Sequence, residues 1–231
     1  MKIKGSYKQQ HKILVATDCI VFGFDEGILK LLVFKRRIEP FKDEWSLIGS
    51  FVNTEESVTD SARRVLFQFT GLENVFLKEL QVYGEVDRDP GARCISIAQY
   101  ALIRIGDYDK GQVALHGAKW FAIDELPDLV LDHNRMIMDA LERLRQNTMH
   151  KPIGFELLPD KFTIPQLQIL YEAIYQKKLD DRNFRKKLLS FDLLIKLNEK
   201  DRSTSKKGAF LYRFDFEKYK KLEESGFNFV L

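Results

Sequence analysis

The segment 50–72 constrains the fold of this chain more than any other stretch. Within it, Val65, Gln68 and Phe69 stand at positions i, i+3 and i+4, so a helix would bring them onto one face. That face is largely apolar. The segment predicts a helix between two loops, with an apolar surface where a catalytic helix would carry charge.

The spacing of this segment resembles a Nudix box, the loop-helix-loop signature of nucleoside-diphosphate hydrolases. The family pattern reads G-x5-E-x7-R-E-U-x-E-E-x-G-U, where U is an aliphatic residue, and its last three Glu residues hold a divalent metal. The positions that match are Glu56, Arg64, Leu66, Gly71 and Leu72. Ser50 replaces the opening Gly, and the metal-binding positions are Val65, Gln68 and Phe69.

These replacements remove the ligands that the reaction needs. Magnesium takes oxygen ligands and is usually anchored by one or two carboxylates, so Val, a neutral amide and Phe have almost no affinity for it. Without the ion, neither the attacking water nor the developing phosphate charge is stabilised. We therefore expect no enzyme activity, no metal and no cofactor. Glu56 and Arg64 could also be an ordinary solvated pair on an amphipathic helix.

The surrounding sequence keeps the pattern of a scaffold. Residues 13–24 and 28–36 are predicted strands joined by a turn at 25–27, and 45–49 is a short strand before the box. Further strands are expected at 75–84, 94–105 and 119–123, and a helix at 131–147. Pro and Gly within 148–154 indicate a linker, which divides the chain into domains 1–150 and 151–231.

Composition narrows the class of protein. With 231 residues, of which 45% are hydrophobic, the chain can form one large or two modest globular domains. No apolar run could span a bilayer and the start is polar, so we expect a cytoplasmic protein without membrane contact. Cys19 and Cys94 lack zinc-site spacing and are expected to be buried free thiols.

Charge differs between the two halves. Residues 151–231 carry 17 basic against 12 acidic side chains, whereas residues 1–150 carry 20 against 22. The C-terminal domain therefore holds the positive charge and is the part suited to phosphate.

That basic domain has the element order of a winged helix-turn-helix. Thr163 and Gln166 form a capping-box pattern at the start of one helix, and a second helix is predicted over 180–189 with Phe184 and Leu188 facing inward. Strands at 193–198 and 209–214, joined by a basic loop, complete the order.

A helix that reads DNA presents Arg, Lys or Asn to base edges, and a basic hairpin loop suits phosphate contact. The candidates on the helix are Arg182, Asn183, Arg185, Lys186 and Lys187, and those on the hairpin are Lys200, Arg202, Lys206 and Lys207. The alternative is a merely solvated charged face.

The whole chain resembles the Nudix-related bacterial transcriptional regulators. The resemblance rests on 88–96, 120–133, 162–168, 183–187 and 211–214. It implies an α+β fold, an α/β/α Nudix sandwich with a mixed sheet, followed by the winged helix domain. It also implies a homodimer that binds a palindromic operator in double-stranded DNA and senses a small metabolite, such as ADP-ribose or L-arabinose.

A sugar is the first choice of effector, because the missing Glu residues weaken the case for a diphosphate. The candidate contacts are Asp43, Trp45, Glu85, Asp87 and Arg93. Surface salt bridges or turns are equally open roles for them, and Trp45 could be a core anchor. Rival functions are a hydrolase with displaced carboxylates Glu55, Glu56 or Glu85, a regulator that senses ADP-ribose, and a protein-binding adaptor.

Overall fold

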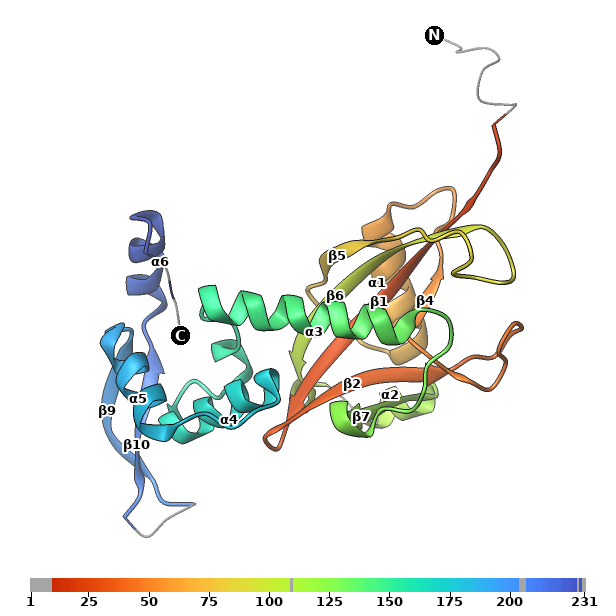
Figure 1. The fold of residues 1–231 in the computed structure, drawn as a ribbon. Coiled ribbons are helices and arrows are strands. Elements are labelled where there is room, and N and C mark those ends of the chain that lie inside the picture. Colours follow the sequence, from red (N-terminus) through yellow and green to blue (C-terminus); the bar gives the residue numbers. More distant parts are fainter. Residues whose placement is uncertain (1–9, 109, 204–206, 228, 230–231) are drawn as a thin grey trace.

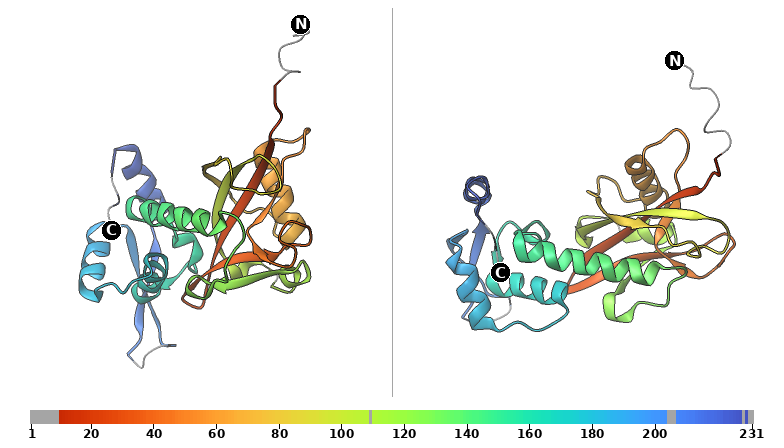
Figure 2. Two further views of the ribbon diagram at one scale, coloured as in Figure 1. Left: turned by 45° about the vertical axis from the view of Figure 1, so that its right-hand side comes forward. Right: turned by 45° about the horizontal axis from the view of Figure 1, so that its top comes forward.

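The computed structural model describes residues 10–108, 110–203, 207–227 and 229 (Figure 1). A large sheet flanked by helices takes up the first part of the chain, and a smaller domain of helices and strands takes up the last part. One long helix, α3 (His133–His150), reaches from the first part to the second, as both views in Figure 2 show. No helix among the described residues is long and apolar enough to cross a membrane.

Among the described residues, seven strands form the large sheet in the order β3-β2-β1-β6-β5, with β4 paired to β1 and β7 paired to β2. They are β1 (Leu14–Asp25), β2 (Ile28–Lys35), β3 (Trp45–Ser46), β4 (Ile48–Phe51), β5 (Lys78–Tyr83), β6 (Cys94–Arg104) and β7 (Ala118–Ala122). Because β1 runs parallel to β6 and antiparallel to β2 and β4, the sheet is mixed, as predicted.

The two faces of this sheet carry separate apolar clusters, since neighbouring residues of a strand point to opposite faces. On β1, Ile20 and Phe22 belong to the cluster that includes α3, and Cys19 and Val21 belong to the cluster that includes α1 (Val58–Thr70). Helices therefore cover both faces. This arrangement confirms the predicted α/β/α sandwich.

Two details of this first domain differ from the sequence-based expectation. A short helix, α2 (Lys110–Leu115), precedes β7 and was not predicted. The helix expected at 131–147 begins at His133 and continues to His150, into the predicted linker. The two cysteines are free and buried, as expected.

The C-terminal domain has the predicted winged helix order. Its elements are β8 (Phe162–Thr163), α4 (Ile164–Tyr175), α5 (Asp181–Ser190), β9 (Leu194–Asp201), β10 (Ala209–Phe214) and α6 (Phe216–Glu224). The described strands pair in the order β8-β10-β9. The predicted capping box is present: Thr163 Oγ1 accepts from the Gln166 backbone N–H, and the Gln166 side chain accepts from the Thr163 backbone N–H. α6 was not predicted.

The two domains share one apolar core. A single cluster of buried side chains extends from the sheet through α3 to α4, α5 and β10. Arg145 on α3 donates from Nε to the carbonyl oxygen of Ile174 on α4, at 3.2 Å. The β1–β2 turn lies against the other side of α4, where a Cβ atom built on Gly27 would stand 2.9 Å from Ile169. The winged helix is therefore packed onto the first domain rather than tethered to it.

Candidate functional site

Two of the three altered box positions carry packing side chains. Val65 is fully buried in the cluster under α1, and the Phe69 ring centroid lies 5.0 Å from that of Phe34 on β2. The Gln68 side chain is exposed, and its backbone oxygen lies 3.0 Å from His116 Nδ1. Two of the positions that would hold metal in a hydrolase therefore pack against apolar side chains instead.

Glu56 and Arg64 form a close pair, with Arg64 Nη2 2.6 Å from Glu56 Oε1 and Nε 2.8 Å from Oε2. The same guanidinium group donates to the Phe51 carbonyl oxygen at 3.2 Å, so the pair ties α1 to the end of β4. The hydrogen bond from Arg64 lowers the pKa of Glu56 to about 2. The pair therefore fixes the loop before α1, which is more than a solvated surface pair would do.

A cavity of about 170 Å³ lies where the box approaches β1 and the start of α3. Its walls come from strands β1, β3 and β4, from the chain that follows β2, from the loop before β6, and from the first residues of α3. Lining side chains include Asp18, Arg36, Arg37, Ser46, Ser50, Phe69, Arg88, Asp89, Leu131 and His133. The end of α1 contributes only an aromatic ring to this wall.

A buried network of charges forms the floor of the cavity. Arg88 donates to both carboxylate oxygens of Asp132, at 2.7 and 3.0 Å, and lies 3.9 Å from Asp18. Asp18 also accepts a 2.5 Å hydrogen bond from Ser96 Oγ. Asp132 stands at the N-cap of α3 but makes no cap hydrogen bond with its side chain, because its carboxylate binds Arg88.

His133 completes this network in its neutral form. The Leu47 backbone N–H donates to Nδ1 at 3.1 Å, so the ring proton resides on Nε2, which lies 3.7 Å from Asp18 Oδ1. Burial lowers the pKa of His133, and the positive charges of Arg88 and Arg36 lower it further, while Asp18 and Asp132 oppose them. The first turn of α3 is thus held by contacts at the floor of the cavity.

Two guanidinium groups at the wall of the cavity bind backbone carbonyl oxygens. Arg36 donates from Nε to the Pro40 carbonyl oxygen at 2.8 Å, and Arg37 donates from Nη2 to the His116 carbonyl oxygen at 3.0 Å. Neither forms an ion pair with a carboxylate within the described part of the chain. Their two positive charges are therefore available to an anionic ligand, whereas the charge of Arg88 is matched by Asp132.

The cavity does not suit a divalent metal ion. Its lining carboxylates are Asp18, which is engaged by Ser96 and Arg88, and Asp89, which accepts the Gly91 backbone N–H. No three His, Cys, Asp or Glu side chains of the described residues come together in a way that could hold a metal. With Val65 buried and Phe69 on the core, this donor set does not fit magnesium.

None of the predicted effector contacts lines the cavity. Asp43, Glu85, Asp87 and Arg93 are exposed, and Arg93 is occupied by the carbonyl oxygens of residues 84, 85 and 94. Trp45 packs edge-on against Phe121 at 5.0 Å, which is the core-anchor role left open above. These residues lie on or beside the loops that wall the cavity, and their contact with a ligand stays a prediction.

Sequence reasoning did not bring Arg36, Arg37, Arg88 and Asp18 together in one site. The signal that could have found Asp18 is a charged residue inside an apolar strand, β1. The arginines reach the cavity through the pairing of β1 with β2 and β6 and through the loops beside these strands.

The predicted reading helix is α5, and its inward residues are as expected. Phe184 and Leu188 are buried, and the Phe184 ring packs 5.8 Å from Tyr171. Every candidate on this helix is exposed: Arg182, Asn183, Arg185, Lys186 and Lys187. Asp180 caps the helix by accepting the Asn183 backbone N–H at 2.8 Å. The basic face of α5 is open to a partner.

The hairpin between β9 and β10 carries the remaining candidates. Arg202 and Lys207 are exposed. Lys206 lies outside the described residues. Contact of any of these side chains with DNA stays a prediction.

Two family models match this chain. The NUDIX domain model matches residues 12–140, which is more than half of the chain. The model of the NrtR DNA-binding winged helix domain matches residues 154–214. The chain belongs to the Nudix family. Its Nudix domain is joined to an NrtR-type winged helix domain, which confirms the resemblance drawn from sequence.

Relatives of this Nudix chain include both regulators and hydrolases. The ADPR responsive transcriptional repressor NtrR of Acinetobacter baylyi is 28% identical over 210 residues, covering 89% of this chain and 84% of the relative. An ADP-ribose pyrophosphatase of Methanocaldococcus jannaschii is 32% identical over 139 residues, covering 60% of this chain and 82% of that protein. The crystal structure of Shewanella oneidensis NrtR complexed with a 27mer DNA is 26% identical, with a TM-score of 0.74, and covers 93% of this chain and 97% of that one.

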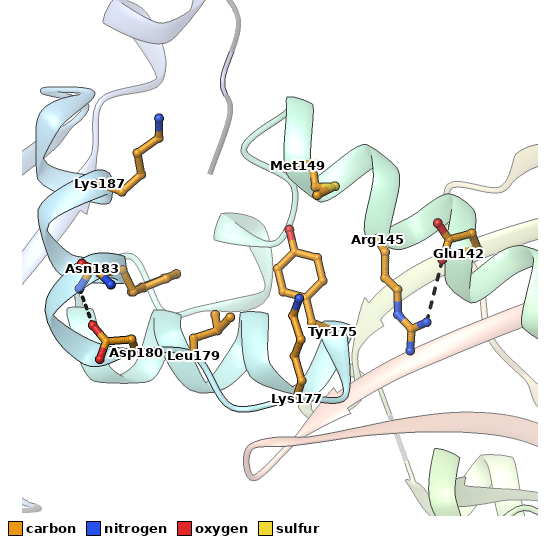
Figure 3. A pocket seen from close by; sticks show the side chains of 10 residues that line it. Glu142, Arg145, Met149, Tyr175, Lys177, Leu179, Asp180, Asn183 and Lys187 are labelled. Carbon is orange, nitrogen blue, oxygen red and sulfur yellow. Dashed lines mark hydrogen bonds and ion pairs between the residues drawn. The ribbon is translucent and has the colours of Figure 1, made fainter.

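A groove of about 510 Å³ separates the end of α3 from the start of α5 (Figure 3). Arg145 and Met149 project into it from α3, Tyr175 from the end of α4, and Asn183 and Lys187 from α5. The end of α3 that is farther from the cavity therefore lies beside α5 of this Nudix chain.

Proposed function

We propose that this protein is a ligand-responsive transcriptional repressor in the cytoplasm. In this proposal the Nudix domain binds a phosphate-bearing metabolite, ADP-ribose or a close relative, and the winged helix domain binds operator DNA. The observation that carries the proposal is a pair of guanidinium groups in the wall of the cavity, Arg36 and Arg37, which bind backbone carbonyl oxygens and form no ion pair with a carboxylate of the described residues.

The two arginines in the cavity wall favour an anion over a neutral sugar. At about 4 Å, two opposite charges near a protein surface attract by roughly 4 kcal/mol before desolvation, and an uncharged pentose gains none of this. Arginine also matches phosphate with two parallel hydrogen bonds. Neither the cavity nor the named relatives support L-arabinose as the ligand.

The size of the cavity limits how much of the ligand it encloses. Pockets for drug-sized ligands typically measure about 300–1,000 Å³, whereas this cavity measures about 170 Å³. We infer that the diphosphate and an adjoining ribose enter the cavity, and that the rest of the molecule lies across the rim formed by the loops at 36–44 and 84–93.

The two arginines also explain why the protein would bind its ligand without hydrolysing it. Arginine neutralises phosphate but does not activate water, which is the part of the reaction that a metal ion supplies. The chain would therefore retain its ligand intact.

α3 provides the connection between ligand and DNA. Its first residues, Asp132 and His133, belong to the floor of the cavity, and Arg145 near its other end binds α4. Displacement of Arg88 by a ligand would change the contacts that hold the start of α3. We infer that the helix carries this change to α4 and α5.

The test is a DNA-binding titration with an operator selected from a random-sequence library. ADP-ribose is expected to lower the affinity for DNA by about 5–150-fold, equally well with EDTA present, and L-arabinose to have no effect. The double variant Arg36→Gln, Arg37→Gln should bind DNA normally but respond weakly to ADP-ribose. The matched control is Arg63→Gln, which removes an exposed charge from α1.

Two outcomes would contradict the proposal. Turnover of ADP-ribose with magnesium or manganese at ordinary enzyme rates would make the chain a hydrolase. A full response to ADP-ribose in the double arginine variant would show that the effector does not bind through these two residues of the cavity. Homodimer formation and a palindromic operator stay predictions, which analytical ultracentrifugation and the selected DNA sequence would check.

A further inference from the structure

The aromatic ring of Phe210 in the hairpin holds two lysine side chains. Phe210 lies on β10 with 37% of its surface exposed. The Lys196 ammonium lies 3.8 Å from the ring centroid, and the Lys200 ammonium lies 4.5 Å from it. Both distances are well inside the range of about 6 Å over which an aromatic face attracts a cation.

Strand pairing explains why these three side chains lie together and on which face of the hairpin they lie. Phe210 is opposite Lys200 and Tyr212 is opposite Lys196, with a register shift between the two pairs. Phe210 and Tyr212 are two residues apart on β10 and so point to the same face, and the contacts with the ring bring both lysine ammonium groups to that face. On that face Tyr212 is buried against the helices of the domain. The ring and its two lysines therefore continue the helix-side face of the hairpin beyond the core, toward the tip.

Nearby acidic groups do not neutralise the two lysines. Glu199 projects from the other face of β9, where it accepts from Lys161 at 2.8 Å. Asp201 accepts the Ser203 backbone N–H at 2.8 Å. Neither Lys196 nor Lys200 forms an ion pair with a carboxylate in the portion of the chain that the structure describes.

The kind of contact matters for what the lysines can bind. A carboxylate partner would cancel the charge of an ammonium group and occupy its N–H donors. An aromatic face attracts the ammonium group without changing its charge, so N–H groups turned away from the ring remain free to donate. The ring orients two cations and leaves their charge available.

We propose that Phe210 is a positioning residue that presents Lys196 and Lys200 together to the phosphate backbone of duplex DNA. The proposal rests on the proposed function, since it names the contact that the hairpin makes with that partner. Lysine acts as a point charge toward phosphate, so this contact adds affinity without sequence preference.

The experiment uses the full chain and a random-sequence duplex, because phosphate contacts do not depend on the operator. Phe210→Leu keeps an apolar side chain and both lysine charges but removes the ring, and it should weaken binding by roughly 3–10-fold, the effect of losing one modest contact. Phe210→Tyr keeps the ring and should bind like the unaltered protein. Thermal unfolding of each variant checks that the fold is retained.

A second pair of variants links the ring to the lysines. Lys196→Gln with Lys200→Gln should lower affinity and reduce the slope of log affinity against log salt by about 1.8, the value for two lost phosphate contacts. Adding Phe210→Leu to this double variant should cause no further loss, because the ring acts only through the two cations.

The outcomes separate this proposal from the one it rests on. If the unaltered protein shows no salt-dependent DNA binding, the proposed function fails. If the unaltered protein binds DNA but Phe210→Leu binds it equally well, only the role of Phe210 is overturned. The same conclusion follows if Phe210→Leu lowers DNA affinity by the same factor with and without the two lysines.

Discussion

At the scale of single residues, Gly49 shows how closely the backbone approaches the charged floor of the cavity. A Cβ atom at this position would stand 2.0 Å from Asp18 Oδ1 and 2.9 Å from the Thr17 carbonyl oxygen. Such distances are far below contact, and the backbone oxygen cannot rotate away. A glycine is required here by space rather than by an unusual backbone angle.

Gly49→Ala is expected to destabilise the fold by about 1–3 kcal/mol, the usual cost of overpacking. This corresponds to a fall in Tm of roughly 2–4 °C per kcal/mol for a chain of this size. The matched control is Gly106→Ala, where nothing lies within 4 Å of the added methyl group. An unchanged Tm for Gly49→Ala, measured by differential scanning fluorimetry, would contradict the close packing.

His133 predicts a dependence of stability on pH. Its pKa is lowered in the folded protein from the ordinary value of 6.5, chiefly by burial, so the unfolded chain binds the proton more readily. The stability that the neutral ring contributes is present above pH 6.5 and is lost as the pH falls toward the lower folded value. Denaturant unfolding of the protein and of His133→Gln should show a steeper acid loss in the unaltered protein.

At the scale of elements, the buried residues of α5 determine which side of this helix faces outward. With about 100° between successive residues, the side directly opposite Phe184 and Leu188 carries Arg182 and Lys186. Arg185 and Lys187 lie on the two flanks of that side. The helix is short and polar, so its position depends on the packing of its two buried side chains.

Arg182→Ala and Lys186→Ala are each expected to weaken operator binding by about 1–3 kcal/mol if they contact base edges. Random-sequence DNA should lose less affinity. Lys207→Ala, in the hairpin, should weaken both DNAs to a similar degree and flatten the salt dependence. Electrophoretic mobility shift with Arg63→Ala as the charge-matched control checks this. If Lys186→Ala lowers the affinity for both DNAs equally, Lys186 contacts the phosphate backbone of the DNA rather than a base edge.

The elements that sequence predicted best are those with a local signal. The capping box of α4 and the strands that became β1, β2 and β6 show regular apolar patterns or cap residues. α2 and α6 were missed because each is short, and α6 has no buried residue of its own to create a pattern. The cavity residues were missed because they meet through pairing and loop paths that no local pattern records.

At the scale of the whole molecule, α3 relates the cavity to the reading helix. Asp132 and His133 hold its first turn to the cavity floor, and Arg145 binds the Ile174 carbonyl oxygen on α4. The sequence placed a boundary just after this helix on the basis of Pro and Gly. It could not show that the apolar core continues across that boundary.

Arg145→Gln is expected to weaken the transmission of the ligand signal more than either binding reaction. The hydrogen bond to α4 would be weakened or lost, so the ratio of DNA affinities with and without ADP-ribose should fall toward one, from a typical range of about 5–150. Glu142→Gln, which alters the same turn of α3 and the 3.8 Å pair with Arg145, serves as the control. Isothermal titration of each ligand alone verifies that both sites remain intact. An unchanged ratio would remove this contact from the coupling.

The continuous core also limits how the DNA-binding end can move. One cluster of buried side chains runs from the Nudix sheet to the winged helix, and close packing of this kind resists separation of the two parts. We expect a free swing about a hinge to break that packing, and a small slide of α4 along α3 to preserve more of it.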